Sequence, residues 1–334
     1  MHPKISVVIV AKNAKTILVQ CLKRLRSQMY DQSLIEVLVI DGGSTDGTQE
    51  VARTFGARVI DGGYPENQEA RRHVGAKLAT GEILLYLDAD NLIPYDTWLL
   101  DMVLPFEQPR VVASFTKWYD PDKSLPSIDR YYALLGGNDP VVYYFGKHDR
   151  VPYGEAYLPK GAELVSTNNS CEIVRFSPKQ LPTIGCNGFL VRKAYLDLLD
   201  LLDTEQFFHT DVHVDLLAKN PNAEYAIVKN TIIHASGGTL LANLRKRLRY
   251  QSEHSERLHK YRRYHIYNSS CWRDRLRLLY IAAVAGTFII PFLRAMVGFF
   301  RTGRWEWFWH PAATFGMVVA YGIALIVNKK RGRA

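Results

Sequence analysis

Two carboxylates one residue apart, Asp88 and Asp90, directly follow an apolar run at residues 83–87. A run with no polar break is the pattern of a strand that is buried on both faces. The Asp-x-Asp pair therefore lies at the carboxyl end of a predicted strand, the edge at which open parallel sheets bind ligands. Carboxylate oxygens suit a hard cation such as Mg²⁺ or Mn²⁺ and leave coordination positions for phosphate oxygens. The alternative is that both acids only cap a turn.

Strands and helices alternate in the chain before these acids. Predominantly apolar segments at residues 5–10, 37–40 and 57–60 predict strands. A helix after the first strand is predicted by four apolar residues at helical spacing: Leu18, Cys21, Leu22 and Leu25. Such alternation indicates βαβ units and a mostly parallel sheet. Since the second and third strands end at Asp41 and Asp61, we expect these acids at the same sheet edge as Asp88 and Asp90.

Four segments, in this order and spacing, resemble the family-2 glycosyltransferases: residues 7–13, 39–48, 69–75 and 81–90. An ordered set of segments over the first 90 residues is more specific than any single motif. The resemblance implies a GT-A fold, in which a Rossmann-like, mostly parallel sheet carries helices on both faces. It also implies a nucleotide-sugar donor and inverting transfer.

The same resemblance implies roles in the donor site. Asp41 matches the acid that reads the nucleotide base, with Ala11 and Asn13 lining that pocket. Arg71 matches an arginine on the diphosphate side, where a guanidinium fork fits phosphate oxygens; a solvated helix charge is the alternative. The family commonly has Pro-x-Tyr-Asn where this chain has Ala11-Lys12-Asn13, and Asn where it has Arg72, so we expect a slightly altered pocket.

Later segments supply the remaining candidates. Gly188 matches a glycine-containing loop that faces donor and acceptor, although an ordinary turn into a strand explains it equally well. Asp211 matches the catalytic base, with Thr210 in place of the family's preceding acid, and Asp215 on the same helix face is its competitor. His234 matches a histidine that many GT-A enzymes place on the metal or diphosphate; a structural histidine is the alternative.

Residues 118–157 are rich in Tyr, Pro, Asp and Gly and show no dominant periodicity. They are interpreted either as an acceptor-facing insertion or as aromatic packing under long loops.

The charge is distributed unevenly along the chain, which has a formal net charge of +9. Residues 1–239 hold 24 Lys and Arg against 29 Asp and Glu, whereas residues 240–334 hold 18 against 4, a net charge of +14. A basic tail beside apolar segments is attracted to anionic lipid headgroups. We expect membrane lipids and no nucleic acid as partners, because no nucleic-acid recognition motif accompanies the charge.

Two apolar stretches in this tail, residues 278–300 and 308–327, have about the length of a spanning helix. They predict a hairpin with both ends on the cytoplasmic side, including the basic residues 329–333. Tryptophans at 305, 307 and 309 suit a membrane interface. Because Arg301 and Arg304 fall in the short outer turn, the first stretch is alternatively an interfacial or re-entrant helix.

The predicted domains are a GT-A catalytic domain at 1–239, a basic amphipathic juxtamembrane segment at 240–275, and two membrane helices with a basic tail at 276–334. Four cysteines without paired spacing and no amino-terminal signal peptide favour a reducing compartment. We therefore expect a metal-dependent glycosyltransferase that acts on a lipid or lipid-linked glycan at the cytoplasmic face of the cell membrane.

Two other functions compete with this expectation. A nucleotidyltransferase also pairs carboxylates on an α/β sheet, but it normally has a glycine-rich phosphate loop near its amino terminus, where this chain has Ala11-Lys12-Asn13. A non-catalytic membrane scaffold of the same fold is the second competitor. It is disfavoured by the joint retention of four acids: Asp41, Asp88, Asp90 and Asp211.

Overall fold

The computed structural model describes residues 2–198, 204–253, 260–268 and 270–330. Its contacts divide the chain into two compact units. The first, here the sheet unit, comprises Met1–Lys117 and Gly161–Ala235; the second, the helical unit, comprises Trp118–Lys160 and Ser236–Ala334. The predicted domain boundaries after residues 239 and 275 stay a prediction.

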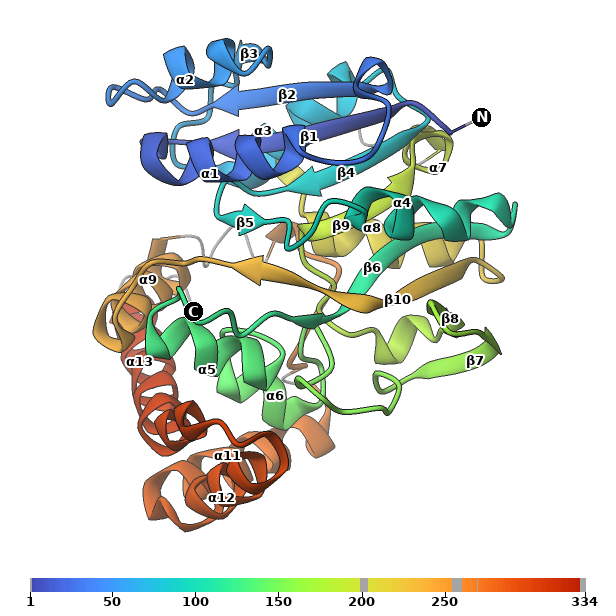
Figure 1. Ribbon diagram of the computed structural model, residues 1–334. Helices are drawn as coiled ribbons and strands as arrows, with labels where there is room; N and C mark the ends of the chain where they lie inside the picture. The colour runs from blue at the N-terminus through green and yellow to red at the C-terminus, as the bar shows by residue number, and fades with distance from the viewer. Residues whose placement is uncertain (1, 199–203, 254–259, 269, 331–334) are drawn as a thin grey trace. The chain divides into compact units, whose positions relative to one another are not determined.

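The first half of the sheet is parallel, as the βαβ pattern predicts. Its four strands neighbour one another in the order β3 (Arg58–Asp61), β2 (Ile35–Asp41), β1 (Ile5–Ala11) and β4 (Ile83–Leu87). In this register Ala11 lies opposite Asp41, and Asp41 lies opposite Asp61. The carboxyl ends of the strands therefore meet at one edge, where the candidate acids were expected (Figure 1).

Beyond β4 the sheet is mixed, because β9 (Asn187–Arg192) runs antiparallel to both of its neighbours, β4 and β6 (Val111–Tyr119). It continues through β9, β6, β10 (Glu224–His234), β8 (Cys171–Phe176) and β7 (Ala162–Thr167). The predicted short strands at 225–228 and 231–234 are one strand, β10. A two-residue strand, β5 (Asn91–Leu92), pairs antiparallel with the end of β10, so the chain just after Asp90 lies beside His234.

Helices cover both faces of the parallel half. α1 (Lys15–Arg26) and α2 (Thr48–Thr54) connect strands that step outward from β1, whereas α3 (Gln68–Leu78) returns the chain from β3 to β4. Right-handed crossovers place the outward and returning connections on opposite faces, and Figure 1 shows α1 in front of the strands and α3 behind them. The buried residues of α1 are the four that its helical spacing predicts: Leu18, Cys21, Leu22 and Leu25. The remaining helices of this unit are α4 (Trp98–Val103), α7 (Lys193–Leu198) and α8 (His209–Lys219).

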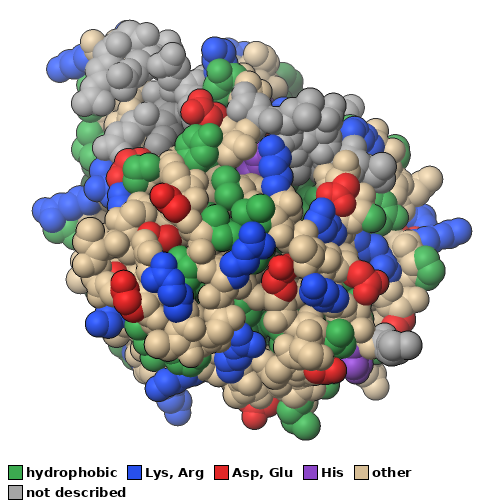
Figure 2. Space-filling model, turned by 90° about the horizontal axis from the view of Figure 1, so that it is seen from above, with side chains coloured by type: hydrophobic (Ala, Val, Ile, Leu, Met, Phe, Trp, Pro, Cys, Tyr) green, Lys and Arg blue, Asp and Glu red, His purple; other side chains and the backbone are tan. Residues whose placement is uncertain are grey.

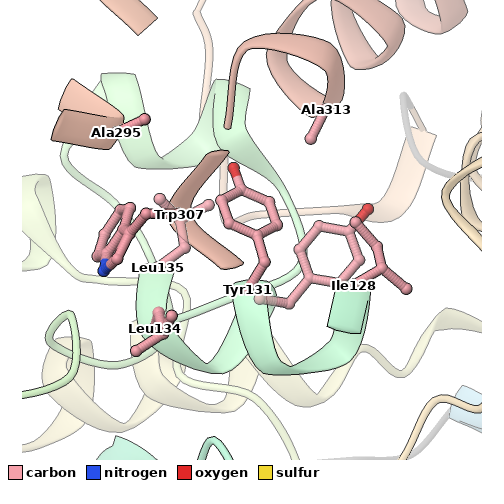
Figure 3. Close-up of a cluster of buried hydrophobic side chains, with 8 residues drawn as sticks. Ile128, Tyr131, Leu134, Leu135, Ala295, Trp307 and Ala313 are labelled. Carbon is pink, nitrogen blue, oxygen red and sulfur yellow. The ribbon is translucent and has the colours of Figure 1, made fainter. Parts of the chain in front are cut away.

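The helical unit contains α5 (Ser127–Leu135), α6 (Pro140–Phe145), α9 (Leu240–Glu253), α11 (Trp272–Thr287), α12 (Ile289–Thr302), the 3₁₀ turn η5 (Trp305–Trp309) and α13 (His310–Lys330). Its core joins α5 to the C-terminal helices: Figure 3 shows Tyr131, Leu134 and Leu135 of α5 with Ala295 of α12, Trp307 of η5 and Ala313 of α13. Residues 118–157 are thus not a run of loops but include two helices whose aromatic side chains form a core.

The first predicted membrane stretch is not one continuous helix. α11 and α12 meet at Phe288, which has φ 60°, and their axes differ by 80°. Among the described residues, Trp305–Lys330 is long and apolar enough to cross a membrane, by length and composition alone. Residues 254–259 and 269 of the predicted juxtamembrane segment, and 331–333 of the predicted basic end, lie outside the described residues.

Candidate active site

Asp41 ends β2, and the loop that follows wraps its carboxylate with donors. Oδ2 accepts hydrogen bonds from the backbone N of Gly43 (3.0 Å), the backbone N of Ser44 (2.8 Å) and Nε2 of Gln49 (2.8 Å). Oδ1 accepts from Oγ of Ser44 at 2.5 Å. Burial alone would raise the pKa of Asp41, but these hydrogen bonds lower it below its usual value. The site therefore holds a fixed negative charge at the end of β2.

Ala11 and Asn13 lie beside this carboxylate, in the loop that follows β1. The backbone O of Ala11 accepts from the backbone N of Gly42 at 2.9 Å. The backbone N of Asn13 donates to Oγ of Ser44 (2.8 Å), and its Oδ1 accepts from the backbone N of Thr45 (2.9 Å). Asn13 has φ 50°, a left-handed conformation that Asn adopts more readily than most residues. The loops after β1 and β2 thus form one hydrogen-bonded wall around Asp41.

Arg71 lies in α3 and reaches across to the same wall. Its Nη1 donates to the backbone O of Tyr64 and of Pro65, both at 2.9 Å, and the residue is 5% exposed. A Cβ on Gly42 would come within 2.5 Å of Nη1, so the glycine lets the guanidinium pass under the loop. Burial and the neighbouring charge of Arg72 lower the pKa of Arg71. In this structure Arg71 holds the 64–65 turn near Asp41, and its contact with a diphosphate stays a prediction.

Arg72, the next residue of α3, binds the first acid of the Asp-x-Asp pair. Its Nη2 donates to Oδ2 of Asp88 at 2.5 Å and its Nε to Oδ1 at 3.3 Å. Its Nη1 donates to Oε1 of Glu69 at 2.7 Å. Burial alone would lower the pKa of Arg72, but Asp88 and Glu69 raise it above its usual value. Both oxygens of Asp88 are therefore occupied by a permanently charged guanidinium.

Asp90 and His234 come together at the same edge, although 144 positions separate them in the sequence. The pairing of β5 with β10 puts the backbone N of Ala235 2.8 Å from the backbone O of Asp90. Nε2 of His234 then lies 3.5 Å from Oδ2 of Asp90, and these side chains are 21% and 31% exposed. A carboxylate and an imidazole thus meet at a partly open position.

The donor set at this position suits a divalent ion. Carboxylate oxygen is the preferred donor for Mg²⁺ and Mn²⁺, and imidazole is accepted by Mn²⁺. Of the three predicted ligands, Asp90 and His234 have their side chains together, whereas Asp88 is turned to Arg72. Across the described residues, no three His, Cys, Asp or Glu side chains are grouped to hold an ion unaided. An ion here would need additional ligands, such as phosphate oxygens of a bound substrate.

Asp211 lies in the first turn of α8, and the residue is fully buried. The helix start is fixed by Glu69, whose carboxylate accepts from the backbone N of His209 (2.9 Å) and from Nδ1 of its ring (2.8 Å). Asp215 lies one turn later and is partly exposed. The role of Asp211 as catalytic base stays a prediction, with Asp215 as its competitor.

Gly188 has a packing role that the sequence left open. It has φ +69°, and a Cβ there would come within 2.5 Å of Cδ1 of Ile232 and 3.1 Å of the Trp98 ring. The pairing of β4 with β9 shifts between Tyr86–Phe189 and Leu87–Asn187, and Gly188 is the residue that this shift skips. Gly188 is therefore required for close packing at the bulge, and a contact with the donor stays a prediction.

The sequence reasoning missed Glu69 and did not assign a role to Arg72. Both lie on α3 three positions apart, the spacing of side chains on one helix face, and both are charged yet buried, at 5% and 3% exposure. The available signal was a pair of opposite charges three positions apart in the helix that directly precedes the Asp-x-Asp strand.

Two comparisons relate the sequence to known proteins. Residues 6–162 match the family model for glycosyl transferase family 2. Glycosyltransferase AglE from Haloferax volcanii is 36% identical over 102 residues, which are 29% of this chain and 33% of that protein. The 4,4'-diaponeurosporenoate glycosyltransferase from Staphylococcus haemolyticus is 35% identical over 174 residues, 49% of this chain and 46% of that protein. The similarity thus spans less than half the length of either relative.

A solved structure extends the likeness of fold to the whole chain. The mannosyltransferase PcManGT from Pyrobaculum calidifontis, solved with GDP-Man and Mn²⁺, superposes with a TM-score of 0.56 at 15% sequence identity, covering 100% of this chain and 89% of that one. At this identity the likeness shows the fold, which is the GT-A fold expected from the sequence.

Proposed function

From the premise that residues 6–162 of this chain match the family model for glycosyl transferase family 2, we propose that the protein transfers a sugar from a nucleoside diphosphate sugar to an acceptor at a membrane surface. The sheet unit is proposed to bind the donor and carry out the transfer. The helical unit is proposed to hold the enzyme at the cytoplasmic face of the cell membrane, where a lipid or lipid-linked glycan is the acceptor.

One observation carries the donor proposal: the hydrogen-bonded wall around Asp41 and the Asp90–His234 pair lie at the same carboxyl edge, at the ends of the parallel strands β2 and β4 that flank β1. A negative carboxylate in a hydrogen-bonded pocket accepts N–H donors of a nucleotide base. A carboxylate and an imidazole farther along the edge suit the diphosphate side. A nucleoside diphosphate is a ligand that needs both features at once.

The diphosphate gains negative charge as the sugar leaves, and the site must stabilise that charge. Asp90 and His234 would hold a Mg²⁺ or Mn²⁺ ion, which when bound stabilises negative charge on the leaving phosphate oxygens. Arg72 keeps Asp88 in place through two hydrogen bonds, and Arg71 adds a cationic side chain beneath the Asp41 wall. Fixed charges of this kind lower the barrier because they require no reorganisation during the reaction.

Asp211 is proposed as the base in transfer to a hydroxyl. The acceptor oxygen forms a bond to the anomeric carbon, the bond from that carbon to the diphosphate oxygen breaks, and the hydroxyl proton passes to Asp211. A single displacement inverts the anomeric carbon. With a lipid phosphate as acceptor the attacking oxygen is already ionised, and Asp211 would orient it instead.

The membrane acceptor is supported by charge and composition. Residues 240–334 carry a net charge of +14, and large apolar side chains are exposed along α11, α12 and α13. On the face seen in Figure 2, blue basic and red acidic side chains are interspersed, so the excess of positive charge is evident from the sequence of the C-terminal part and not from this face. The attraction to anionic lipid is thus proposed for the C-terminal part of the chain.

A donor panel tests the proposal. Purified full-length protein is incubated with nucleoside diphosphate sugars of different bases and sugars, with Mg²⁺ or Mn²⁺, and the released products are identified. Release of a nucleoside diphosphate from one donor class, faster in the presence of membrane extract, is expected. Release of pyrophosphate from a nucleoside triphosphate and a sugar phosphate would instead indicate a nucleotidyltransferase. No turnover and no donor binding would indicate the non-catalytic scaffold.

A further inference from the structure

The last two long helices of the helical unit turn mainly small or polar residues inward and large apolar residues outward; Met317 of α13 is a large apolar residue that is buried. In α12 the buried positions are Pro291, Ala295 and Gly298. A Cβ on Gly298 would come within 2.3 Å of the Trp307 ring, so the indole lies directly on the helix backbone. Five exposed positions are large and apolar, at 48% to 74% exposure: Ile289, Phe292, Leu293, Val297 and Phe300. Two further exposed positions of α12 are cationic, Arg294 and Arg301. A water-facing helix has the reverse arrangement.

α13 shows the same inversion along a polar seam, defined as His310, Thr314, Tyr321 and Asn328. Nδ1 and Nε2 of His310 lie 2.7 and 3.0 Å from the hydroxyls of Tyr131 and Tyr144. Thr314 donates to the backbone O of His310, Tyr321 donates to Asp139, and Asn328 donates to the backbone O of Gln251. The outward face carries exposed apolar residues: Phe315, Val319, Ile323, Leu325 and Ile326.

Exposed aromatic rings connect the two outward faces into one surface, here the aromatic patch: Phe288, Phe292, Phe308 and Phe315. The ring centroids of Phe288 and Phe315 are 5.1 Å apart, and those of Phe292 and Phe308 are 6.1 Å apart. Each of the four residues is nevertheless 39% to 48% exposed. Aromatic rings that contact one another but remain uncovered mark a surface that an apolar partner completes.

The lengths and neighbours of α11, α12 and α13 disfavour their crossing a lipid bilayer. α11 and α12, with 16 and 14 residues, extend about 24 and about 21 Å at 1.5 Å per residue, less than a hydrocarbon core of about 30 Å. The 80° bend prevents them from adding their lengths. α13 is long enough, but it lies along α9 from Gly316, which contacts Leu244, to Asn328. α9 exposes three cationic side chains, Arg245, Lys246 and Arg249, which a spanning α13 would carry toward the hydrocarbon.

We propose that the helical unit is a monotopic platform: the aromatic patch and the outward faces of α12 and α13 enter one leaflet, and no described helix crosses the bilayer. Anionic phospholipid is the partner that matches the charge of residues 240–334, because cationic side chains beside an immersed apolar face bind such headgroups. This inference deepens the membrane association proposed above and does not depend on the transfer chemistry.

Side-specific labelling tests the topology. Single cysteines are introduced as Met29→Cys in the sheet unit, Arg304→Cys between α12 and α13, and Lys329→Cys at the end of α13, in a Cys271→Ser background that removes the native cysteine that is not buried. Sealed membrane vesicles of one orientation, prepared from expressing cells, are treated with a membrane-impermeant maleimide. Met29→Cys reports the side of the sheet unit, and nucleotide-sugar hydrolysis on the same vesicles reports the donor site separately.

The monotopic platform predicts that all three cysteines are labelled from the same side and that the protein stays with the membrane in high salt. Arg304→Cys protected while Lys329→Cys is labelled would establish the hairpin and overturn the proposal. Lys329→Cys protected alone would establish a single crossing and also overturn it. A protein released entirely by salt would show that the aromatic patch does not enter lipid.

Substitutions in the aromatic patch test the contact itself. The double variant Phe292→Ser, Phe308→Ser should lower the membrane-bound fraction of full-length protein at least ~10-fold. The reason is that the transfer of these two rings from water into lipid supplies much of the apolar free energy of binding. Met29→Ser, at a residue 68% exposed in the sheet unit, is the control that should not change the bound fraction. Equal binding by both variants would refute the patch as the membrane contact.

Discussion

Arg72 donates two hydrogen bonds to Asp88, from Nη2 to Oδ2 at 2.5 Å and from Nε to Oδ1 at 3.3 Å. The same guanidinium binds Glu69, which in turn holds the first residue of α8. Three elements, α3, the end of β4 and the start of α8, are therefore fixed to one another through a chain of charged groups. Asp90, a candidate metal ligand, is two residues after Asp88 at one end of this chain of groups, and the candidate base Asp211 is two residues after His209 at the other end.

Removing Arg72 should destabilise the protein. Arg72→Gln removes the cation from Asp88 and leaves the buried Glu69 with His209 alone. Losing one partner of a buried pair costs about 3–5 kcal/mol. Chemical denaturation of the full-length protein measures this change. Arg53→Gln, at an exposed position of α2, is the matched control and should shift the free energy of unfolding by less than ~0.5 kcal/mol. An unchanged denaturation midpoint for Arg72→Gln would contradict the network.

The contribution of Glu69 should depend on pH. Burial alone would raise its pKa, but His209 and Arg72 lower it well below the usual value. A group with a depressed folded-state pKa stabilises above its unfolded pKa, near 4.5, and loses that contribution as the pH falls further. The difference in unfolding temperature between wild type and Glu69→Gln should shrink as the pH falls below 4.5. A difference that grows over that range would have the wrong sign.

Asp90 and His234 should control the metal requirement. Activity should disappear in excess chelator and return with Mn²⁺ or Mg²⁺. Asp90→Ala should abolish the activity, and His234→Ala should raise the Mn²⁺ concentration for half-maximal rate by ~10-fold or more, since ligand loss weakens binding on that scale. Asp96→Ala, at an exposed acid of the sheet unit, is the control. Full turnover in chelator would exclude the proposed role of the ion.

Asp211→Asn should reduce transfer to a hydroxyl acceptor by at least ~100-fold while the KM for the donor changes little, because a general base acts on the proton and not on donor binding. Asp215→Asn serves as the comparison. If Asp215→Asn shows the larger loss, the base is Asp215. If neither variant slows transfer, the acceptor is an ionised phosphate.

Gly298→Ala should destabilise the helical unit. Ala normally favours a helix over Gly by about 1 kcal/mol, but here the new Cβ would come within 2.3 Å of the Trp307 ring. Overpacking of this kind costs about 1–3 kcal/mol. Gly286→Ala in α11, where a Cβ meets nothing within 4 Å, should instead be neutral or stabilising. Equal effects of the two substitutions would show that the contact of Trp307 with α12 is not tight.

Part of this architecture follows from the sequence because it depends on local pattern. Apolar runs and helical spacing identify β1, α1, β2 and β4, and parallel connection brings Asp41 and Asp88 to one edge. The proximity of His234 to Asp90 was expected only through family resemblance, since it depends on the pairing of β10 with a two-residue strand.

Other features depend on orientation or on distant contacts. Arg71 and Arg72 are consecutive in α3 and point about 100° apart, so only the packed helix decides which one reaches Asp88. The bend at Phe288 has no glycine at the turn to signal it. α5 does have a signal, with Ile128, Tyr131, Tyr132 and Leu135 at helical spacing, but its core partners are more than 150 residues away in α12, η5 and α13.

The assignment of the donor site to Asp41 is tested most directly by calorimetry. The nucleoside diphosphate from the active donor is titrated, with divalent ion present, into wild type, Asp41→Asn and Asp31→Asn. Asp31 caps a turn at the opposite, amino end of β2 and is the matched control. If the Asp41 carboxylate binds the nucleotide base, Asp41→Asn should weaken binding by at least ~10-fold, the scale of one lost charged hydrogen bond. Asp31→Asn should bind with the affinity of wild type. Equal affinity of wild type and Asp41→Asn would contradict the assignment of the donor site to this edge of the sheet.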